Sequence, residues 1–108
     1  MNRRSESEWN DKITVRVDPE LADLIPGFLD NRRKDVEFVH GALKQGDFEV
    51  IRTVGHKMRG DGGGYGFQEI SEIGEALEQA AKHRNSIQIH RWVKELSNYL
   101  ERIEVVYD

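Results

Sequence analysis

Apolar residues recur at helical spacing through most of the 108-residue chain. From residue 19 onward they follow one another three or four positions apart, which is the spacing of a helix with one apolar face. Four such stripes cover residues 28–43, 48–65, 67–81 and 89–103, with short polar connections between them. Short connections favour antiparallel neighbours. The pattern therefore predicts an all-α fold, an up-down-up-down antiparallel four-helix bundle over residues 19–108.

Residues 1–18 follow a different pattern. The first twelve (MNRRSESEWNDK) are polar and charged, and apolar and polar residues then alternate over residues 13–17 (ITVRV). Alternation is typical of a strand, but we find no partner strand elsewhere in the sequence. We therefore expect residues 1–18 to be a flexible or extended N-terminal arm that lies on the bundle.

Residues that begin or end helices stand at the expected boundaries. Asp18 and Pro19 predict a short N-terminal helix across one end of the bundle, which Pro26 ends or kinks. Asp47 and Asn85 are acceptors of the kind that cap the first turn of a helix, and each precedes one of the apolar stripes.

Composition narrows the possible functions. The chain has no cysteine, which excludes disulfides, thiolate chemistry and cysteine-ligated zinc. A net charge of −4 argues against nucleic acid as the main partner. We find no apolar run of the ~20 residues that a membrane span needs, and no signal peptide, so we expect a cytoplasmic protein without membrane insertion. His40, His83 and His90 lack the i, i+4 spacing of a helical metal site, and we expect no bound metal or cofactor.

Six of the ten glycines lie between residues 55 and 66. Glycine inside a helix costs ~1 kcal/mol relative to alanine, so a helix with this many glycines needs a reason for them. Helical register divides the cluster. Gly55 and Gly62 fall on the apolar side, where they allow another helix to approach closely, and Gly66 ends the helix.

The other face of this helix carries a histidine. Residues three, four, seven and eight positions on share a face with His56, and they are Arg59, Gly60, Gly63 and Gly64. His56 lies about 140° around the helix from Ile51 and therefore points away from the core. The sequence predicts an exposed imidazole beside a guanidinium on a surface without other side chains.

The next helix offers a partner for this imidazole. If the helix runs to Tyr65 and the chain then reverses, residues whose numbers add up to about 134 lie level on the two helices. Glu78 is then level with His56, and its carboxylate can accept one imidazole N–H and leave the other nitrogen as an outward lone pair. If residues 61–66 were instead a loop, His56 would face Ser71.

An oriented, exposed imidazole nitrogen is a nucleophile that can take a phosphoryl group, and a neighbouring cation offsets charge on the phosphoryl oxygens. The sequence contains no nucleotide-binding loop and no metal-binding pair of acids. Donor and acceptor sites, with any Mg²⁺, must therefore belong to partner proteins.

This segment resembles the signature of histidine-containing phosphotransfer (HPt) domains of bacterial two-component phosphorelays. The signature is a histidine followed by a basic residue at +3, glycine at +4, a small residue at +7 and glycine at +10, here His56, Arg59, Gly60, Gly63 and Gly66. Glu78 matches a Glu or Gln that the family often has at +22. The specific part of the resemblance covers residues 55–78, and the helix pattern extends it to residues 19–105.

The resemblance implies a four-helix bundle whose histidine carries phosphate between the aspartate of a receiver domain and another receiver or a histidine kinase. Three positions depart from the family pattern. Gly55 stands where alanine is common, Arg59 where lysine is usual, and Asp61 where a small residue is usual. Asp61 adds negative charge near the site.

From the residues and the resemblance together we predict a monomeric phosphorelay intermediate without catalytic turnover of its own. His56 is the phosphoacceptor, Glu78 orients it, and Arg59 screens the phosphate. The surface that docks partners comprises Lys57, Gly60, Gly63 and Gly64. The alternative is a helical module that binds receiver domains or other signalling partners without phosphorylation. A catalytic domain with His56 as general base would need an enclosed site and a second catalytic group, which the sequence does not show.

Overall fold

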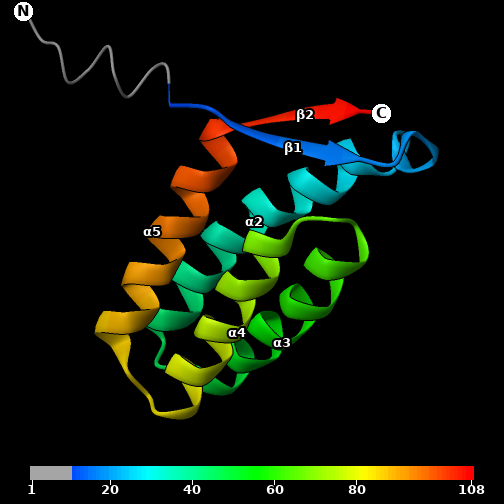
Figure 1. Ribbon diagram of the computed structural model, residues 1–108. Coiled ribbons are helices and arrows are strands. Elements are labelled where there is room, and N and C mark those ends of the chain that lie inside the picture. The colour runs from blue at the N-terminus through cyan, green and yellow to red at the C-terminus, as the bar shows by residue number, and fades with distance from the viewer. Residues whose placement is uncertain (1–10) are drawn as a thin grey trace, which may run out of the picture.

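The structure is a computed structural model that describes residues 11–108. It contains four long helices, one 3-10 turn and two short strands (Figure 1). In chain order the elements are β1 (Ile13–Val17), η1 (Pro19–Leu21), α2 (Ile25–Lys44), α3 (Phe48–Gly64), α4 (Gln68–Lys82), α5 (Ser86–Arg102) and β2 (Ile103–Tyr107).

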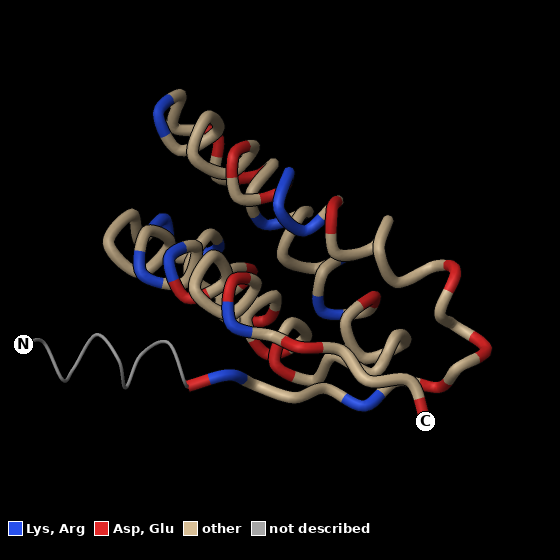
Figure 2. Tube along the Cα trace, turned by 90° about the horizontal axis from the view of Figure 1, so that it is seen from above, with Lys and Arg blue, Asp and Glu red and all other residues tan. Residues whose placement is uncertain are grey.

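The four helices form a helical bundle, and the chain reverses direction at each short connection between them (Figure 1). The predicted caps begin two of the helices. Asp47 accepts a hydrogen bond from the Val50 N–H at 3.2 Å, and Asn85 accepts one from the Gln88 N–H at 3.1 Å. Seen from above, acidic and basic residues are mixed along the helices (Figure 2).

At the N-terminal end of the bundle, Asp18 accepts a hydrogen bond from the Glu20 N–H at 2.9 Å, but the helix that follows is a 3-10 turn of three residues. Helix α2 begins at Ile25, with Pro26 in its first turn. Proline fits there because the first turn leaves its backbone N–H groups unbonded in any case.

The predicted apolar stripes meet in one core. Ten side chains are less than 2% exposed, and they come from all four helices and from the α3–α4 connection: Ile25, Val39, Ile51, Met58, Phe67, Ile70, Leu77, Ile89, Val93 and Leu96. Burial of such side chains stabilises the fold by roughly 1.5–3 kcal/mol each. No helix within residues 11–108 combines the length and apolarity of a membrane span.

The two strands correct the predictions made for both ends of the chain. Residues 13–17 do have a partner, because β1 pairs in parallel with β2 in a register that joins Ile13 to Ile103 and Val17 to Tyr107. The fold is therefore not purely α-helical, and α5 ends at Arg102, short of the predicted end at residue 103. The segment IEVVY is rich in β-branched and aromatic residues that suit a strand. Residues 1–10 of the predicted arm lie outside the described residues.

Helices α3 and α4 pack closely through three glycines. A Cβ atom on Gly55 would lie 2.6 Å from the backbone nitrogen of Glu78, and one on Gly62 would lie 2.6 Å from that of Ser71. From the other side, a Cβ on Gly74 would lie 2.5 Å from the backbone nitrogen of Arg59. The predicted packing role of Gly55 and Gly62 is confirmed, and Gly74 is the matching residue on α4.

Candidate functional site

His56 lies on the outer face of α3. Its side chain is 59% exposed, whereas Ile51, Gly55 and Met58 of the same helix are buried. The outward direction that helical register predicts is confirmed. The backbones of α3 and α4 are in contact at the neighbouring Gly55, so the side chain of His56 is within reach of α4.

Glu78 of α4 is the residue that His56 meets. The Nδ1 atom of His56 lies 3.2 Å from Oε2 of Glu78. Helix α3 continues to Gly64 before the chain turns, and Gly66 has a φ of +90° in that turn. The longer of the two helices considered from the sequence is thus correct. Ser71 lies about two turns before Glu78 on α4, and its Oγ–H donates a hydrogen bond to the Arg59 carbonyl oxygen at 2.7 Å.

His56 and Glu78 form a pair of an exposed base and a buried acid. The side chain of Glu78 is only 10% exposed, and its Oε1 atom has no hydrogen-bond partner among residues 11–108. When the imidazole proton is on Nδ1, it is donated to Oε2, and Nε2 then carries the lone pair. No described residue hydrogen-bonds to Nε2, so this lone pair faces solvent.

Arg59 lies against the same edge of the imidazole. Its Nη2 atom is 3.4 Å from Nδ1 of His56, and its Nε atom is 3.9 Å from Oε1 of Glu78. Nδ1 cannot donate to Glu78 and accept from Arg59 at once, because it has either a proton or a lone pair. When Nδ1 donates to Glu78, Nε2 has the lone pair and is nucleophilic. When Nδ1 accepts from Arg59, the ring proton is on Nε2. The predicted cation is present, on the Nδ1 side of the ring.

The predicted docking glycines lie in open space. A Cβ atom added to Gly60 or Gly64 would meet nothing within 4 Å, and one added to Gly63 would meet only Ser71 Oγ at 4.0 Å. The structure gives these three glycines no packing role of the kind that Gly55 has. They add no side chain to the α3 surface beside His56 and Arg59.

The flank of α3 that faces α2 holds Lys57 and Asp61. The Oδ2 atom of Asp61 is 3.8 Å from Nη1 of Arg32, whose Nε atom also binds Asp35 at 2.8 Å. Burial raises the pKa of Asp35 above its usual value, while the charges of Arg32 and, more weakly, Lys57 act to lower it. The negative charge of Asp61 is therefore offset by Arg32 rather than left unpaired beside the imidazole.

Arg32 is a residue whose role the sequence analysis missed. The sequence predicts no role for it, although it stands within the apolar stripe over residues 28–43. Its side chain is 12% exposed, and its guanidinium carbon lies 4.9 Å from the centre of the Phe28 ring. An arginine within an apolar stripe was the available signal, but its partner Asp61 becomes visible only when α2 and α3 are packed together.

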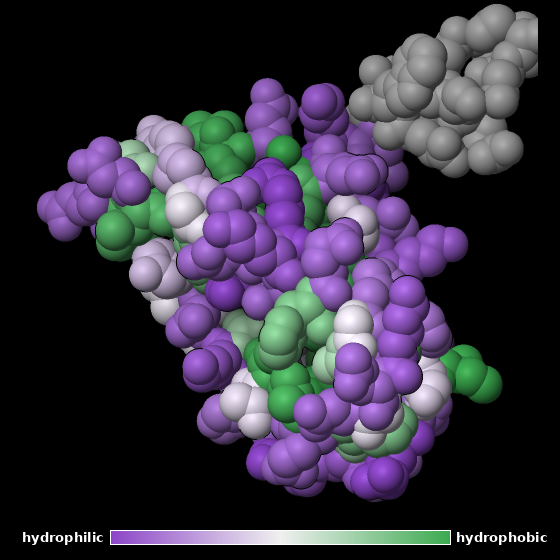
Figure 3. Space-filling view, turned by 180° about the vertical axis from the view of Figure 1, so that it is seen from behind, coloured by the Kyte–Doolittle hydropathy of each residue, from purple (hydrophilic) through white to green (hydrophobic). Residues whose placement is uncertain are grey.

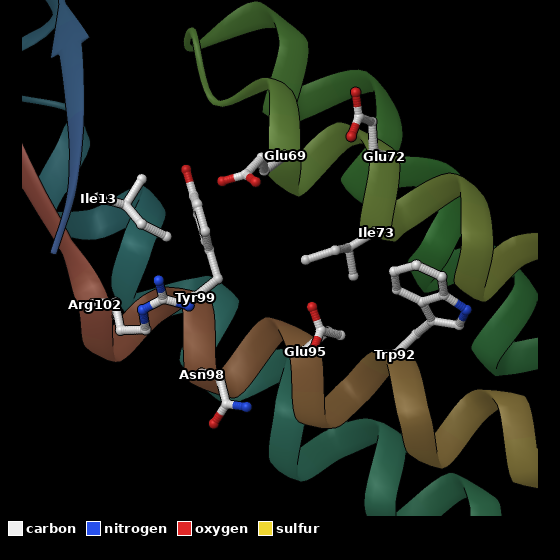
Figure 4. A pocket seen from close by; sticks show the side chains of 9 residues that line it. All are labelled: Ile13, Glu69, Glu72, Ile73, Trp92, Glu95, Asn98, Tyr99 and Arg102. Atoms are coloured by element: carbon white, nitrogen blue, oxygen red, sulfur yellow. The ribbon is translucent and has the colours of Figure 1, made fainter. Parts of the chain in front are cut away.

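The site is an open surface rather than a cleft. His56, Arg59 and Glu78 line none of five cavities on the described part of the chain. One cavity of about 170 Å³ lies between α4 and α5 beside β1, with Tyr99, Trp92 and three glutamates on its walls (Figure 4).

Seen from behind, the molecule is mostly hydrophilic, with apolar side chains in small separate areas (Figure 3). Within residues 11–108, no group of three or more His, Cys, Asp or Glu side chains could hold a metal ion.

Comparison with known proteins gives one match. No curated protein and no solved structure matches the chain. A family model described as "Hpt domain" matches residues 23–105, which include the full length of all four helices and the whole of the His56 site. The chain belongs to the Hpt domain family, whose members carry phosphoryl groups on a histidine in two-component phosphorelays.

Proposed function

We propose that this chain is a phosphorelay intermediate in which His56 is the phosphoacceptor. The observation that carries the proposal is the 3.2 Å contact between Nδ1 of a solvent-exposed His56 and the buried carboxylate of Glu78. This contact favours the tautomer with a free lone pair on Nε2. A nucleophile oriented in this way at an open surface suits transfer to and from another protein's active site.

The transfer is a displacement at phosphorus. The Nε2 lone pair attacks the phosphoryl group of a phosphoaspartate in a receiver domain, an Nε2–P bond forms, and the P–O bond to the aspartate breaks. The aspartate leaves as a carboxylate, and Mg²⁺ held by the receiver offsets its charge. The Nδ1 proton stays between the imidazole and Glu78 throughout. The reverse reaction passes the phosphoryl group to another receiver, and a hybrid histidine kinase is the other partner that the proposal includes.

The remaining predicted residues offset the charge of the phosphoryl group or leave room for the partner protein. Arg59 lies close enough to swing from Nδ1 toward a phosphoryl group on Nε2, where its charge offsets the phosphoryl oxygens. Lys57 is exposed on the α2 side of His56 and adds a second cation for partner contacts. Gly60, Gly63 and Gly64 leave room for the receiver to approach. The chain carries the group and has no nucleotide site of its own in this proposal.

Incubation with a phosphorylated receiver domain and Mg²⁺ tests the proposal directly. We expect label to appear on the wild-type chain, to be lost on acid treatment as phosphohistidine is, and to be absent from His56→Gln. The matched control is His83→Gln, because His83 is also exposed but lies at the end of α4. This control should accept label at the wild-type rate.

Binding to receiver domains, measured beside labelling, separates the phosphorelay proposal from the alternative function. A non-phosphorylated module would bind receiver domains equally well as wild type and as His56→Gln and would never acquire label. Equal labelling of His56→Gln and wild type would place the phosphoryl group on another residue and overturn the assignment of His56.

A further inference from the structure

Two histidines meet on the surface of the bundle, and they come from the two helices that do not hold His56 and Glu78. His40 of α2 and His90 of α5 have ring centres 6.2 Å apart and ring planes inclined by 41°. Both residues are exposed. They are fifty positions apart in the sequence, and the packing of α2 against α5 brings them together. Neither residue has a part in the proposed phosphotransfer.

The ring nitrogens of this pair have no protein partners within the described chain, where His56 is the one histidine that forms a hydrogen bond or an ion pair. Contact between aromatic rings at this distance is ordinary packing when the rings are buried. These rings are exposed and polar, so their contact removes little apolar surface from water. Two adjacent imidazoles with free nitrogens are, however, a common pair of metal ligands.

The distance between the rings is slightly longer than a shared ion requires. An imidazole nitrogen binds a transition metal at about 2.0–2.1 Å, which places each ring centre about 3.2 Å from the metal. Two rings on one ion therefore have centres about 5–6 Å apart, depending on the angle between the bonds. A distance of 6.2 Å requires only small side-chain rotations, which exposed residues make readily.

We propose that His40 and His90 together bind a divalent transition-metal ion and so cross-link α2 to α5. Imidazole favours Cu²⁺, Ni²⁺ and Zn²⁺, with Cu²⁺ bound most tightly, and disfavours Mg²⁺ and Ca²⁺, which prefer oxygen ligands. No third metal-ligating side chain is close enough among residues 11–108, so water completes the coordination. The site is thus an exchangeable surface site rather than a closed structural one.

Binding that requires two helices in native positions favours the folded state. The tag-free chain titrated with NiCl₂ at pH 7.5 should bind one ion per molecule and melt at a temperature several degrees higher. His40→Gln and His90→Gln should each weaken binding at least tenfold and abolish the rise in Tm. With CuCl₂, the electron paramagnetic resonance spectrum should show two nitrogen ligands in wild type and one in either variant.

The matched control is His83→Gln, which removes an exposed histidine outside the pair and should leave stoichiometry, affinity and Tm shift unchanged. His56→Gln is a second control, because a lone accessible imidazole can bind metal weakly. Binding that persists in the His40→Gln, His90→Gln double variant, or that is lost in His56→Gln, overturns the proposal. A wild-type Tm that nickel does not raise overturns it as well.

Discussion

Nδ1 of His56 lies close to both an acceptor and a donor. Oε2 of Glu78 is 3.2 Å from it, and Nη2 of Arg59 is 3.4 Å from it. If the Glu78 contact selects the reactive tautomer, Glu78→Leu should slow phosphotransfer to His56 by about tenfold, the value of one hydrogen bond to a charged group. Glu78→Gln keeps an oxygen that can accept the proton and should retain most of the rate. Initial rates with a phosphorylated receiver domain measure both variants.

The free energy of unfolding of Glu78→Leu shows whether slower phosphotransfer comes from the lost contact or from damage to the fold. Oε1 of Glu78 is buried without a hydrogen-bond partner in the described chain, so replacing the carboxylate with leucine should cost little free energy of unfolding. Nitrogen chemical shifts of the His56 ring should show the proton moving away from Nδ1 in Glu78→Leu. A slow variant with an unchanged tautomer would show that Glu78 acts in another way.

Tyr99 gives a pH-dependent prediction away from the site. Burial, aided by the negative charge of Glu69, raises the pKa of Tyr99 from 10.0 to about 12. Between these two pH values the native state binds more protons than the unfolded state, so stability falls as the pH rises through this window. Tyr99→Phe should lessen that fall, as measured by denaturant midpoints at pH 9 and pH 11.5.

Absorbance at 295 nm provides the check on the assignment. In wild type, one of the three tyrosines should ionise about two pH units later than an ordinary tyrosine, and this late step should be missing in Tyr99→Phe. Three tyrosines that all ionise near pH 10 in the folded protein would contradict the burial of this hydroxyl.

At the scale of elements, glycines set how closely α3 and α4 pack. Gly55→Ala places a Cβ 2.6 Å from the backbone of Glu78, so the helices must separate, at a cost of about 1–3 kcal/mol. Alanine at this position is common in the family that the sequence resembles. The cost here follows from the tight approach of α4, which Gly74 contributes on its side. Chemical denaturation of Gly55→Ala measures it.

Gly60→Gln tests access on the same helix. A side chain there meets nothing within 4 Å, and replacing helical glycine should stabilise the fold by about 0.5–1 kcal/mol. Phosphotransfer should nevertheless slow, since the added side chain stands where a receiver would dock. Gly41→Gln in α2 is the matched control, because its Cβ is equally free; it should gain stability and keep the wild-type rate. Equal rates for both variants would remove the docking role from Gly60.

The contact between His56 and Glu78 could be predicted from the sequence because it depends on local rules alone. Helical register fixed the outward direction of His56, and the position of the turn near Gly66 fixed which residue of α4 is level with it. Arg32 and Asp61 are different. Their pairing depends on how α2 packs against α3, and α2 has no comparable stripe of glycines to fix that packing.

At the scale of the whole molecule, the main error in the structure predicted from the sequence concerned the two ends of the chain. Residues 13–17 showed the alternation of a strand, but their partner begins ninety positions later, at Ile103. A parallel pair needs a long crossover between its strands, and here the entire bundle is that crossover. The apolar residue at position 103 also fitted the stripe of the last helix. Nothing local could decide between helix and strand until the fold placed β1 beside it.

The strand pair should contribute to stability without contributing to transfer. Val17 is 3% exposed and belongs to the apolar core, so Val17→Ala should destabilise the fold by about 1–2 kcal/mol. His56 lies on α3 against α4, whereas the sheet extends from the N-terminal side of α2 and the end of α5 (Figure 1). The phosphotransfer rate per folded molecule should therefore stay at the wild-type value. Thr14→Ala, on the exposed face of β1, is the control and should change neither quantity. A fall in rate beyond the loss of folded protein would mean that the ends of the chain act on the histidine site.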